Sequence, residues 1–210
     1  MYLKRNNMPK TWHLPRKGTT YIIRPIFKMK MGIPLLILLR DMLKLARTRK
    51  EVKKLLNTGK IKINQKVARD DKAVLMLFDV LSLENKNLKL ILKNKKFDVA
   101  EVKGKEAEEK IAKITGKKIL KGKKTQINLN DGRNCLSEEK IRTGDSAVID
   151  LKENKISEIL PLKTGSRIIF IVGKYLGEEG IIEKIENNDV LVKIKDGKVN
   201  SKSKFIMVVR

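Results

Sequence analysis

Apolar residues occur in short runs divided by turn-forming residues, and this pattern constrains the fold more than any other feature of the sequence. After residue 74 the runs lie at Leu75–Leu83, Leu88–Leu92, Phe97–Val102, Ile127–Leu129 and Ala147–Leu151. The turn signals between them are Asn85-Lys86-Asn87, Asn94, Asn130-Asp131-Gly132 and Gly144-Asp145. Such runs are typical of strands. They predict a β-rich central domain over 85–162, in which Glu106–Ile111 is the only clear helix.

The C-terminal part continues the same pattern. Strands are predicted at Arg167–Val172, Ile181–Ile185, Val190–Ile194 and Phe205–Val209, with a turn signal at Asp196-Gly197. Four short strands predict a small SH3-like barrel over 163–210. In the loop 173–180, Gly177 and Gly180 are expected to supply positive φ. Lys174 and Tyr175 lie at the loop's tip, where we weigh an ordinary hairpin and an RNA contact equally.

Helical spacing appears between residues 33 and 59. Pro34 suits the first turn of a helix, and an apolar stripe follows at Leu35, Leu38, Leu39, Met42 and Ala46. Arg40, Lys44 and Arg47 recur on another side of that helix, which is therefore basic, and all three are predicted RNA contacts. A capping box at Thr48–Glu51 predicts a second helix, with Val52, Leu55 and Leu56 as its apolar face and Gly59 as its end.

A predicted hairpin follows the second helix directly. Lys60–Ile63 alternates with period two, Asn64-Gln65 is a turn signal, and Lys66-Val67 is the returning strand. The region 33–84 is therefore predicted to be a helix–helix–hairpin module. Together with the central domain and the barrel, it predicts an α+β protein that is mostly β.

Positive charge indicates the class of partner. The chain holds 49 Lys and Arg against 24 Asp and Glu, a net charge of +25. Residues 1–66 hold 18 of the basic and 2 of the acidic side chains. Such an excess suits a polyphosphate partner. Aromatic residues are only 4%, so structured RNA recognised through phosphate and shape fits better than many stacked bases.

The basic residues of the module can share one surface. They are Arg47, Arg49, Lys50, Lys53, Lys54, Lys60, Lys62 and Lys66. Each lysine alone is most simply a solvated surface charge. Eight cations with only Glu51 among them favour an RNA-binding face instead.

Residues 1–32 predict a basic extended arm. Pro9, Pro15, Gly18 and Pro25 interrupt it. The plain alternative is a disordered tail, but Trp12 and the isoleucines at 22, 23 and 26 favour a segment that orders on RNA. Its predicted RNA contacts are Lys4, Arg5, Lys10, Trp12, Arg16 and Lys17.

Chemistry-bearing motifs are few. One cysteine, Cys135, and one histidine, His13, exclude an internal disulfide and a Cys/His zinc cluster. The segment Gly116–Lys124 fails the phosphate-loop spacing and has Lys124 where a hydroxyl is required. The acidic pairs Asp70-Asp71 and Glu178-Glu179 are expected to be solvated. No enzyme, metal or cofactor is predicted, and the longest apolar run, Ile33–Leu39, is too short to span a membrane.

The stretch PLLILLRDMLKLARTRKEVKKLLNTGKIKINQK resembles the alpha-L RNA-binding fold. Around it stand YLKRNNMPKTWHLPRK, FDVLSL, LNDGRN and, near the end, GSRIIFIVGKYLGEEGIIEKI, which resembles a KOW motif. In this order they are similar to the small-subunit ribosomal protein four family of the archaeal and eukaryotic type. The resemblance covers nearly the whole chain.

The resemblance implies a structural, non-catalytic part of the small ribosomal subunit. Its partners would be small-subunit rRNA and neighbouring ribosomal proteins, in the cytoplasm, with no membrane and no small-molecule substrate. Carried onto this sequence, it implies an RNA face of Arg47, Thr48, Arg49, Lys50, Lys53, Lys54, Lys60, Lys62, Asn64 and Lys66, with Lys174 and Tyr175 in the KOW stretch. Gly180 falls at the characteristic glycine of that motif.

Two alternatives stay open. An RNA-modifying enzyme could carry an alpha-L module, although the ~100 residues between module and barrel are few for a catalytic domain. A transcription or translation factor could use the barrel for transient contacts. Retention on small subunits through a high-salt wash would separate a structural component from both.

Overall fold

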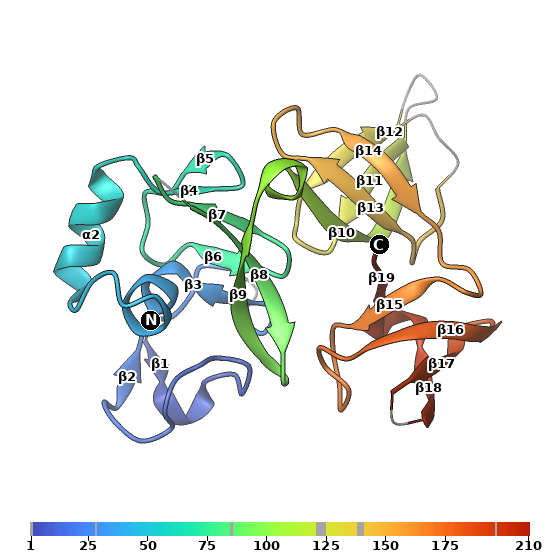
Figure 1. Cartoon of the computed structure of the whole chain (residues 1–210), viewed down its shortest axis with the longest axis horizontal. Coiled ribbons are helices and arrows are strands. Elements are labelled where there is room, and N and C mark those ends of the chain that lie inside the picture. The colour runs from blue at the N-terminus through green and yellow to red at the C-terminus, as the bar shows by residue number, and fades with distance from the viewer. Residues whose placement is uncertain (1, 28, 85, 121–124, 138–140, 196) are drawn as a thin grey trace. The chain divides into compact units, whose positions relative to one another are not determined.

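Strands form most of the secondary structure in the computed structural model, which describes residues 2–27, 29–84, 86–120, 125–137, 141–195 and 197–210. The chain divides into two units, 1–107 and 108–210 (Figure 1). Among these residues helices are few and short, and the α-helices that the structure describes lie in the first unit. The prediction of a mostly β protein is confirmed at this level.

The N-terminal segment is not the extended arm that the sequence predicted. It forms strand β1 (Leu3–Lys4), a 3₁₀ turn (Arg5–Asn7) and strand β2 (Tyr21–Ile22), and β1 pairs with β2. Leu3, Met8 and Trp12 are buried. The indole Nε1 of Trp12 donates a hydrogen bond of 2.8 Å to the carbonyl of Gly32. Burial of these apolar side chains holds the segment against the rest of the unit.

The first predicted helix is shorter than its apolar stripe suggested. Strand β3 (Gly32–Pro34) leads into helix α1 (Leu35–Ile37) and one π-helical turn (Leu38–Met42). The helical segment ends there, and Lys44 has a φ of 54°. Residues 35–39 are all buried, so the segment lies in the core rather than along its edge. Strand β3 pairs with β6 (Val74–Met76).

The second helix and the hairpin confirm their predictions. Helix α2 (Arg49–Asn57) begins at a capping box in which Thr48 and Glu51 exchange hydrogen bonds, and Gly59 follows its end with a φ of 73°. Strands β4 (Lys62–Ile63) and β5 (Lys66–Val67) pair across Asn64 and Gln65, whose φ angles are 48° and 65°. Two positive φ angles define the tight turn that suits the twist of a hairpin.

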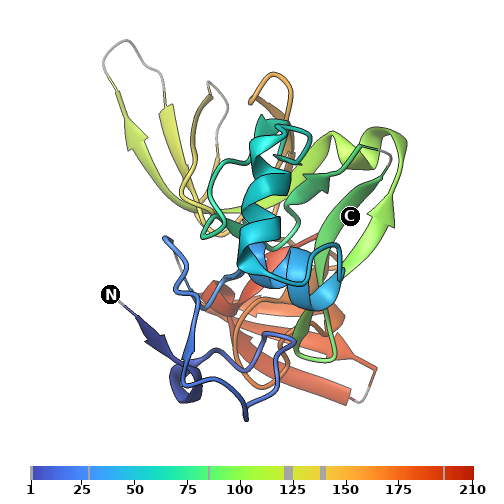
Figure 2. The ribbon, with the colours of Figure 1, turned by 90° about the vertical axis from the view of Figure 1, so that its left-hand side faces the viewer.

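A five-stranded antiparallel sheet completes the first unit. Its remaining strands are β7 (Val80–Ser82), β8 (Asn87–Lys93) and β9 (Lys96–Val102), in the order β5-β4-β7-β8-β9. The predicted strand 75–83 is thus two strands, β6 and β7, separated by a turn where Phe78 has a φ of 64°. Asn85 of the predicted turn lies outside the described residues. Figure 2 shows α2 beside the π-helical turn.

The second unit begins with a sheet that the sequence only partly revealed. Its strands are β10 (Glu109–Ile119), β11 (Thr125–Leu129), β12 (Asn134–Ser137), β13 (Ser146–Asp150) and β14 (Ile156–Leu160), in the order β12-β11-β10-β13-β14. The predicted helix Glu106–Ile111 is wrong. A 3₁₀ turn (Gly104–Ala107) precedes β10 instead. Ala112, Ile114, Ile127 and Ala147 are fully buried in the core of this sheet. Residues 121–124 of the phosphate-loop-like segment are outside the described part.

A second five-stranded sheet follows. Its strands are β15 (Arg167–Phe170), β16 (Glu179–Glu186), β17 (Asp189–Ile194), β18 (Gly197–Lys202) and, after a 3₁₀ turn (Ser203–Phe205), β19 (Ile206–Val208), in the order β18-β17-β16-β15-β19. Strand β18 was not predicted. Asp196 of the predicted turn is not among the described residues. Ile168, Val190, Val192 and Ile206 form the centre of the core.

The two predicted glycines of the loop before β16 differ. Gly177 has a φ of 81°, as predicted. Gly180 lies inside β16, and the prediction of positive φ for it is wrong. A Cβ there would lie 2.5 Å from Val192 Cγ1 and 2.7 Å from the carbonyl oxygen of Lys193. Gly180 is needed for the close approach of β17.

Candidate nucleic-acid interface

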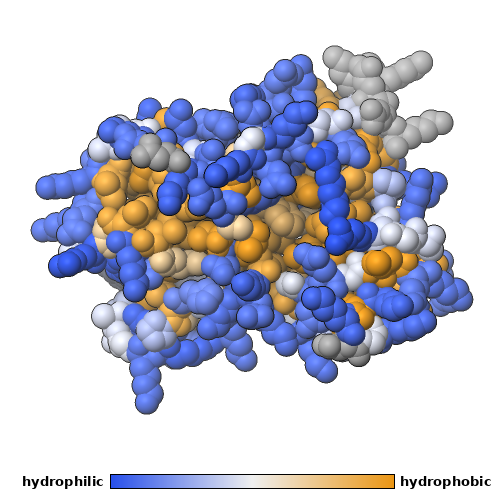
Figure 3. All heavy atoms as spheres, in the orientation of Figure 1, coloured by the Kyte–Doolittle hydropathy of each residue, from blue (hydrophilic) through white to orange (hydrophobic). Residues whose placement is uncertain are grey.

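Helix α2 separates apolar from cationic side chains. Val52 and Leu56 are buried, so the helix side that carries Lys50, Lys53 and Lys54 faces solvent, where all three are exposed. Figure 3 shows hydrophilic side chains projecting from the edge at which Figure 1 places α2. We call the exposed cations of α2 and its flanks the basic face. Its members are Arg47, Arg49, Lys50, Lys53, Lys54, Lys60, Lys62 and Lys66.

Arg49 is fixed by a buried carboxylate. Its Nε and Nη2 donate to the two oxygens of Asp71, the second over 3.2 Å. The side chain of Asp71 is 3% exposed and that of Arg49 is 48% exposed. Burial would raise the pKa of Asp71, but the hydrogen bond and charge of Arg49 outweigh it and lower that pKa. The expectation that Asp71 is solvated is therefore wrong, and a bidentate pair orients the arginine at the surface.

The hairpin contributes three cations and one buried amide. Lys62 and Lys66 are exposed, and Lys60 forms an ion pair of 2.5 Å with Glu84. Asn64 is 4% exposed. Its Nδ2 donates to Asp79 over 2.7 Å, and its Oδ1 accepts from the amide of Val80 over 3.0 Å. Asn64 thus stabilises the turn, and its burial removes it from the predicted RNA contacts.

Two further predicted contacts in the N-terminal segment have structural partners. Trp12 is 1% exposed and is also withdrawn. The guanidinium of Arg5 donates to the carbonyls of Thr19 and Pro15 over 2.7 and 2.8 Å, which ties the loop before β2 to the 3₁₀ turn after β1. Lys4, Lys10, Arg16 and Lys17 remain exposed. Arg16 also donates to the carbonyl of Asn6 over 3.3 Å.

The predicted contacts Arg40 and Lys44 differ in exposure. Arg40 is half-buried and pairs with its neighbour Asp41 over 2.9 Å, so much of its charge is already compensated. Lys44 is exposed. Thr48, another predicted contact, accepts a hydrogen bond from the amide of Glu51 over 3.2 Å. The hydroxyl of Thr48 therefore serves the helix cap.

The loop before β16 places Lys174 and Tyr175 next to each other. Lys174 is exposed with its Nζ 5.5 Å from the ring centre of Tyr175. That ring packs against Phe170 at 5.8 Å between centres, so Tyr175 supports the loop from within. Lys174 is the half of this pair that is free to reach a partner.

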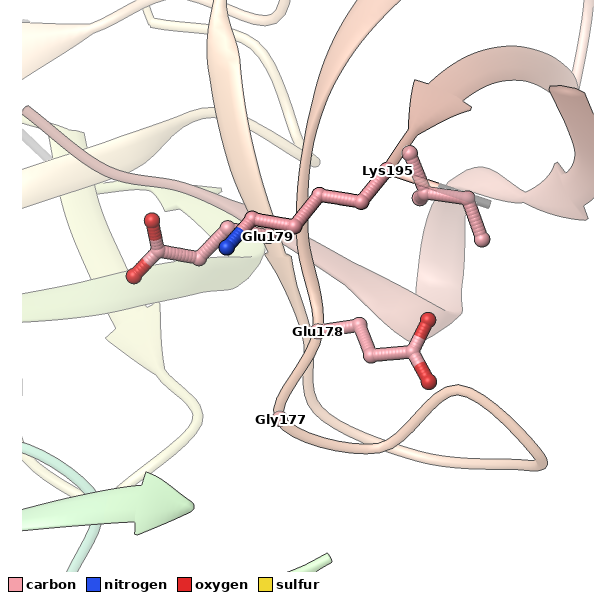
Figure 4. A pocket seen from close by; sticks show the side chains of 5 residues that line it. Gly177, Glu178, Glu179 and Lys195 are labelled. Atoms are coloured by element: carbon pink, nitrogen blue, oxygen red, sulfur yellow. The ribbon is translucent and has the colours of Figure 1, made fainter. Parts of the chain in front are cut away.

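A hollow of about 440 Å³ lies beside that loop, lined by Gly177, Glu178, Glu179, Ile194 and Lys195. Figure 4 shows the carboxylates of Glu178 and Glu179 on opposite sides of the backbone. Two carboxylates and one lysine disfavour a phosphate there. The loop's tip is therefore better suited to RNA than the hollow is.

Sequence reasoning missed several exposed cations and rings around the basic face. They are Arg24, Arg69, Lys72, Tyr2 and Tyr21. The excess of basic residues before residue 66 was a signal for Arg24. The tyrosines had no signal, because only the pairing of β1 with β2 brings them together.

Groups suited to chemistry are few in the part of the chain that is described. No set of three or more His, Cys, Asp or Glu residues there could hold a metal ion. Cys135 is buried, and this burial raises the pKa of its thiol. None of the helices within the described ranges is long and apolar enough to cross a membrane.

The fold and the exposed cations define a basic, mostly β protein with a helix-and-hairpin surface suited to a polyanion. Residues 84–156 match the model of ribosomal family S4e. The small ribosomal subunit protein eS4 of Methanocella arvoryzae is 30% identical over 220 residues, which cover 99% of this chain and 93% of the relative. That of Methanocaldococcus jannaschii is 32% identical over 90% of this chain and 83% of its own. The chain belongs to the S4e family of ribosomal proteins.

A solved structure has the same fold. The crystal structure of 30S ribosomal protein S4e from Thermoplasma acidophilum superposes with a TM-score of 0.73 at 24% identity, covering 85% of this chain and 95% of that chain. The two proteins therefore share a fold over most of this chain.

Proposed function

We propose that this protein is a structural constituent of the small ribosomal subunit that binds small-subunit rRNA and supports subunit assembly and translation. The observation that carries the proposal is the basic face, which gathers exposed cations on one helix and its hairpin within a family of small-subunit proteins. Its partners are rRNA and neighbouring ribosomal proteins, its place is the cytoplasmic ribosome, and its role is not catalytic.

We assign residues 33–84 to an alpha-L RNA-binding module and 163–210 to a KOW, SH3-like barrel. The β-rich domain that the sequence predicted over 85–162 begins later, because β8 and β9 pair with β7 in the sheet of the first unit, so we place that domain in 108–162. The capped helix α2 and the tight hairpin support the first assignment. The sheet order β18-β17-β16-β15-β19 and the close-packed Gly180 support the second. The N-terminal segment 1–32 belongs structurally with the first module, because Trp12 is buried against Gly32.

The predicted RNA contacts are the cations that remain exposed. They are Lys4, Lys10, Arg16, Lys17, Lys44, Arg47, Arg49, Lys50, Lys53, Lys54, Lys60, Lys62, Lys66 and Lys174. Lysines and arginines of this kind bind phosphates and release counterions from the RNA. Arg49 is distinct because Asp71 holds its guanidinium in place, so it binds with less loss of side-chain freedom.

Replacing Arg47, Lys50 and Lys53 by Gln tests the basic face. Each phosphate contact contributes roughly 0.7–0.9 to the slope of log affinity against log salt, so the triple variant is expected to flatten the slope by about 2 to 3. Affinity for small-subunit rRNA would be measured by filter binding over a salt series. Arg49 is left intact because its loss would strand the buried Asp71.

A matched control lies in the same unit. Lys93, Lys95 and Lys96 are exposed at the turn between β8 and β9, and their replacement by Gln removes the same charge. The control should leave the slope nearly unchanged. If both triple variants flatten the slope equally, binding depends on net charge alone and the basic face is misplaced.

Crosslinking in gently lysed cells tests the assembly. Peptides from residues 40–66 crosslinked to rRNA, in the gradient fractions that hold small subunits, are expected. Crosslinks confined to the top of the gradient would contradict a structural role and favour a transient factor or an RNA-modifying enzyme.

A further inference from the structure

Two tyrosines on the N-terminal hairpin face solvent as a pair. Tyr2 is 82% exposed and Tyr21 is 54% exposed, and their ring centres lie 5.6 Å apart with planes tilted by 51°. Side chains alternate along a strand, so Leu3 points into the core while Tyr2 and Lys4 lie on the outward face. Paired rings left exposed in this way indicate a surface that a partner covers.

A hollow of about 410 Å³ lies beside Tyr2. The segment Ile22–Ile26 forms one wall, and Arg49 and Lys72 contribute to the other. This volume is in the range of about 300–1,000 Å³ that is common for sites that bind small organic groups. The amide of Ile26 donates to the carbonyl of Lys72 over 3.3 Å, which joins the two walls. We call this hollow, with Tyr2 at its edge, the hairpin pocket.

The lining of the hairpin pocket combines two kinds of surface. Tyr2, Pro25 and the isoleucines supply an apolar wall, and Ile26 is 67% exposed. Arg24, Arg49 and Lys72 supply three cations. Arg49 is shared with the basic face, so a backbone bound there continues directly to the pocket. A nucleotide has the matching chemistry, because a base stacks on rings and apolar side chains while its phosphates bind cations.

We propose that the hairpin pocket binds one unpaired nucleotide of the rRNA, with its base against Tyr2 and the apolar wall and its flanking phosphates at Arg24, Arg49 and Lys72. The inference rests on the proposed function and adds a mode of recognition to it. The basic face alone contacts phosphates, which are the same in every sequence. The pocket would instead distinguish a strand with an extruded base from a fully paired helix.

Charge favours RNA over a protein side chain as the occupant. The first unit carries 27 basic and 9 acidic side chains over residues 1–107, a net charge of +18. Arg49 already pairs with Asp71, but an apolar side chain of a protein would fill the wall and offer no anion to Arg24 and Lys72. An rRNA nucleotide satisfies both.

Two synthetic RNA hairpins with one stem sequence provide the probes, one fully paired and one with a single bulged 2-aminopurine. Stacking of a base on protein side chains strengthens binding, so we expect the full-length protein to bind the bulged hairpin about tenfold more tightly. The fluorescence of the bulged base should change on binding. Affinity would be measured by fluorescence anisotropy at fixed salt.

Variants then locate the effect. Tyr2→Ala and Ile26→Ser should remove the preference for the bulged hairpin without weakening binding to the paired one. Both side chains are exposed, so thermal melting should be unchanged. Leu136→Ala is the matched control and should keep the preference, because Leu136 is an apolar residue that is 61% exposed, close to the 67% of Ile26. The double variant with Lys50→Gln and Lys53→Gln should weaken binding to both RNA hairpins by the same factor.

The outcomes separate the pocket from the basic face. Equal affinity of the wild-type protein for both hairpins, with the lysine variant still weaker, overturns the pocket and leaves the proposed function. Binding to neither hairpin overturns both. The pocket is also overturned if the preference for the bulge survives Tyr2→Ala and Ile26→Ser. It is overturned, too, if those variants keep the RNA preference but lose a neighbouring ribosomal protein from the subunit.

Discussion

Asp131 accepts a hydrogen bond from a lysine that is almost completely buried. Lys110 is 1% exposed, and its Nζ lies 2.6 Å from Asp131 Oδ2. The other oxygen of Asp131 accepts from the amide of Arg133 over 2.9 Å. Burial opposes ionisation, but the charge of Lys110 prevails and lowers the pKa of Asp131. The LNDGRN sequence around Asp131 therefore joins a turn to β10.

Asp131→Ala is expected to destabilise the second unit by about 3–5 kcal/mol, because it breaks the buried ion pair that Asp131 forms with Lys110. Glu153→Ala is the control, since Glu153 pairs with Lys155 where both side chains are more than half exposed, and it should cost less than about 1 kcal/mol. Native-state hydrogen exchange of the β10 and β11 amides measures both. Similar losses in the two variants would refute the structural importance of the buried pair.

The burial of Lys113 should make the stability of the protein depend on pH. Its Nζ donates to the carbonyls of Ser203 and Ile206 over 2.6 and 2.7 Å, and burial lowers its pKa from 10.5 to about 8. Between these values the unfolded chain binds more protons than the folded one, so this group makes stability rise with pH. The gain is at most about 3 kcal/mol, because the two carbonyls favour the charged form.

The variant Lys113→Met lacks this titration. The difference in urea-unfolding free energy between wild type and variant should therefore shift in favour of the wild type from pH 7.5 to 10.5, when followed by circular dichroism. Groups that titrate in both proteins cancel in the difference. A difference that stays constant, or shifts the other way, would contradict the burial of a charged Lys113.

At the residue scale, the sequence predicted which lysines of α2 are exposed, but it did not predict which polar and aromatic side chains are buried. The exposed lysines of α2 followed from helical spacing around Val52 and Leu56. Trp12, Asn64 and Asp71 were misjudged because each is buried by partners distant in sequence, namely Gly32, Asp79 and Arg49. Local sequence carries no information about such partners.

At the scale of elements, Gly180 determines how closely β16 and β17 can pair. Gly180→Ala places a Cβ 2.7 Å from a backbone oxygen of Lys193, which cannot move without displacing the strand. We expect a loss of about 1–3 kcal/mol. Gly116→Ala is the matched control, because its Cβ would lie 3.6 Å from the nearest atom, Asn128 Nδ2. Hydrogen exchange of the β17 amides should increase in the first variant only, and equal exchange in both would show that Gly180 is not required for packing.

Elements with local signals were predicted well. Helix α2 has its capping box and Gly59, and the hairpin has Asn64-Gln65, so both were located within a few residues. Strand β10 was missed because Lys110 and Lys113 occupy buried positions. Charged residues at core positions break the alternation that marks a strand.

At the scale of the whole molecule, charge is divided unequally. Residues 1–107 carry a net charge of +18, and residues 108–210 carry 22 basic and 15 acidic side chains, a net charge of +7. Family resemblance indicated the function, whereas charge indicated only a polyanionic partner. The division into two units had no sequence signal, because the boundary at 107 lies between a 3₁₀ turn and β10 rather than in a linker.

This distribution predicts opposite effects of salt on the free protein and on its complex with RNA. Raising KCl from 0.05 to 0.3 M shortens the Debye length from roughly 14 Å to roughly 6 Å, so repulsion within the free chain weakens and its stability rises. The gain should be larger in the first unit. The same change weakens RNA binding, because releasing the same counterions into more concentrated salt gains less entropy.

Unit-resolved hydrogen exchange of the free, full-length protein measures the first effect. Amides of β8, in the first unit, should gain more protection with salt than amides of β13, in the second. KCl acts mainly by screening, whereas sulfate would also strengthen apolar burial, so KCl is the appropriate salt. Equal gains in the two units would show that the 18 excess positive charges of the first unit lie far enough apart for their repulsion to have little effect on its stability. The stability of the free protein would then depend on packing rather than on the distribution of its charge.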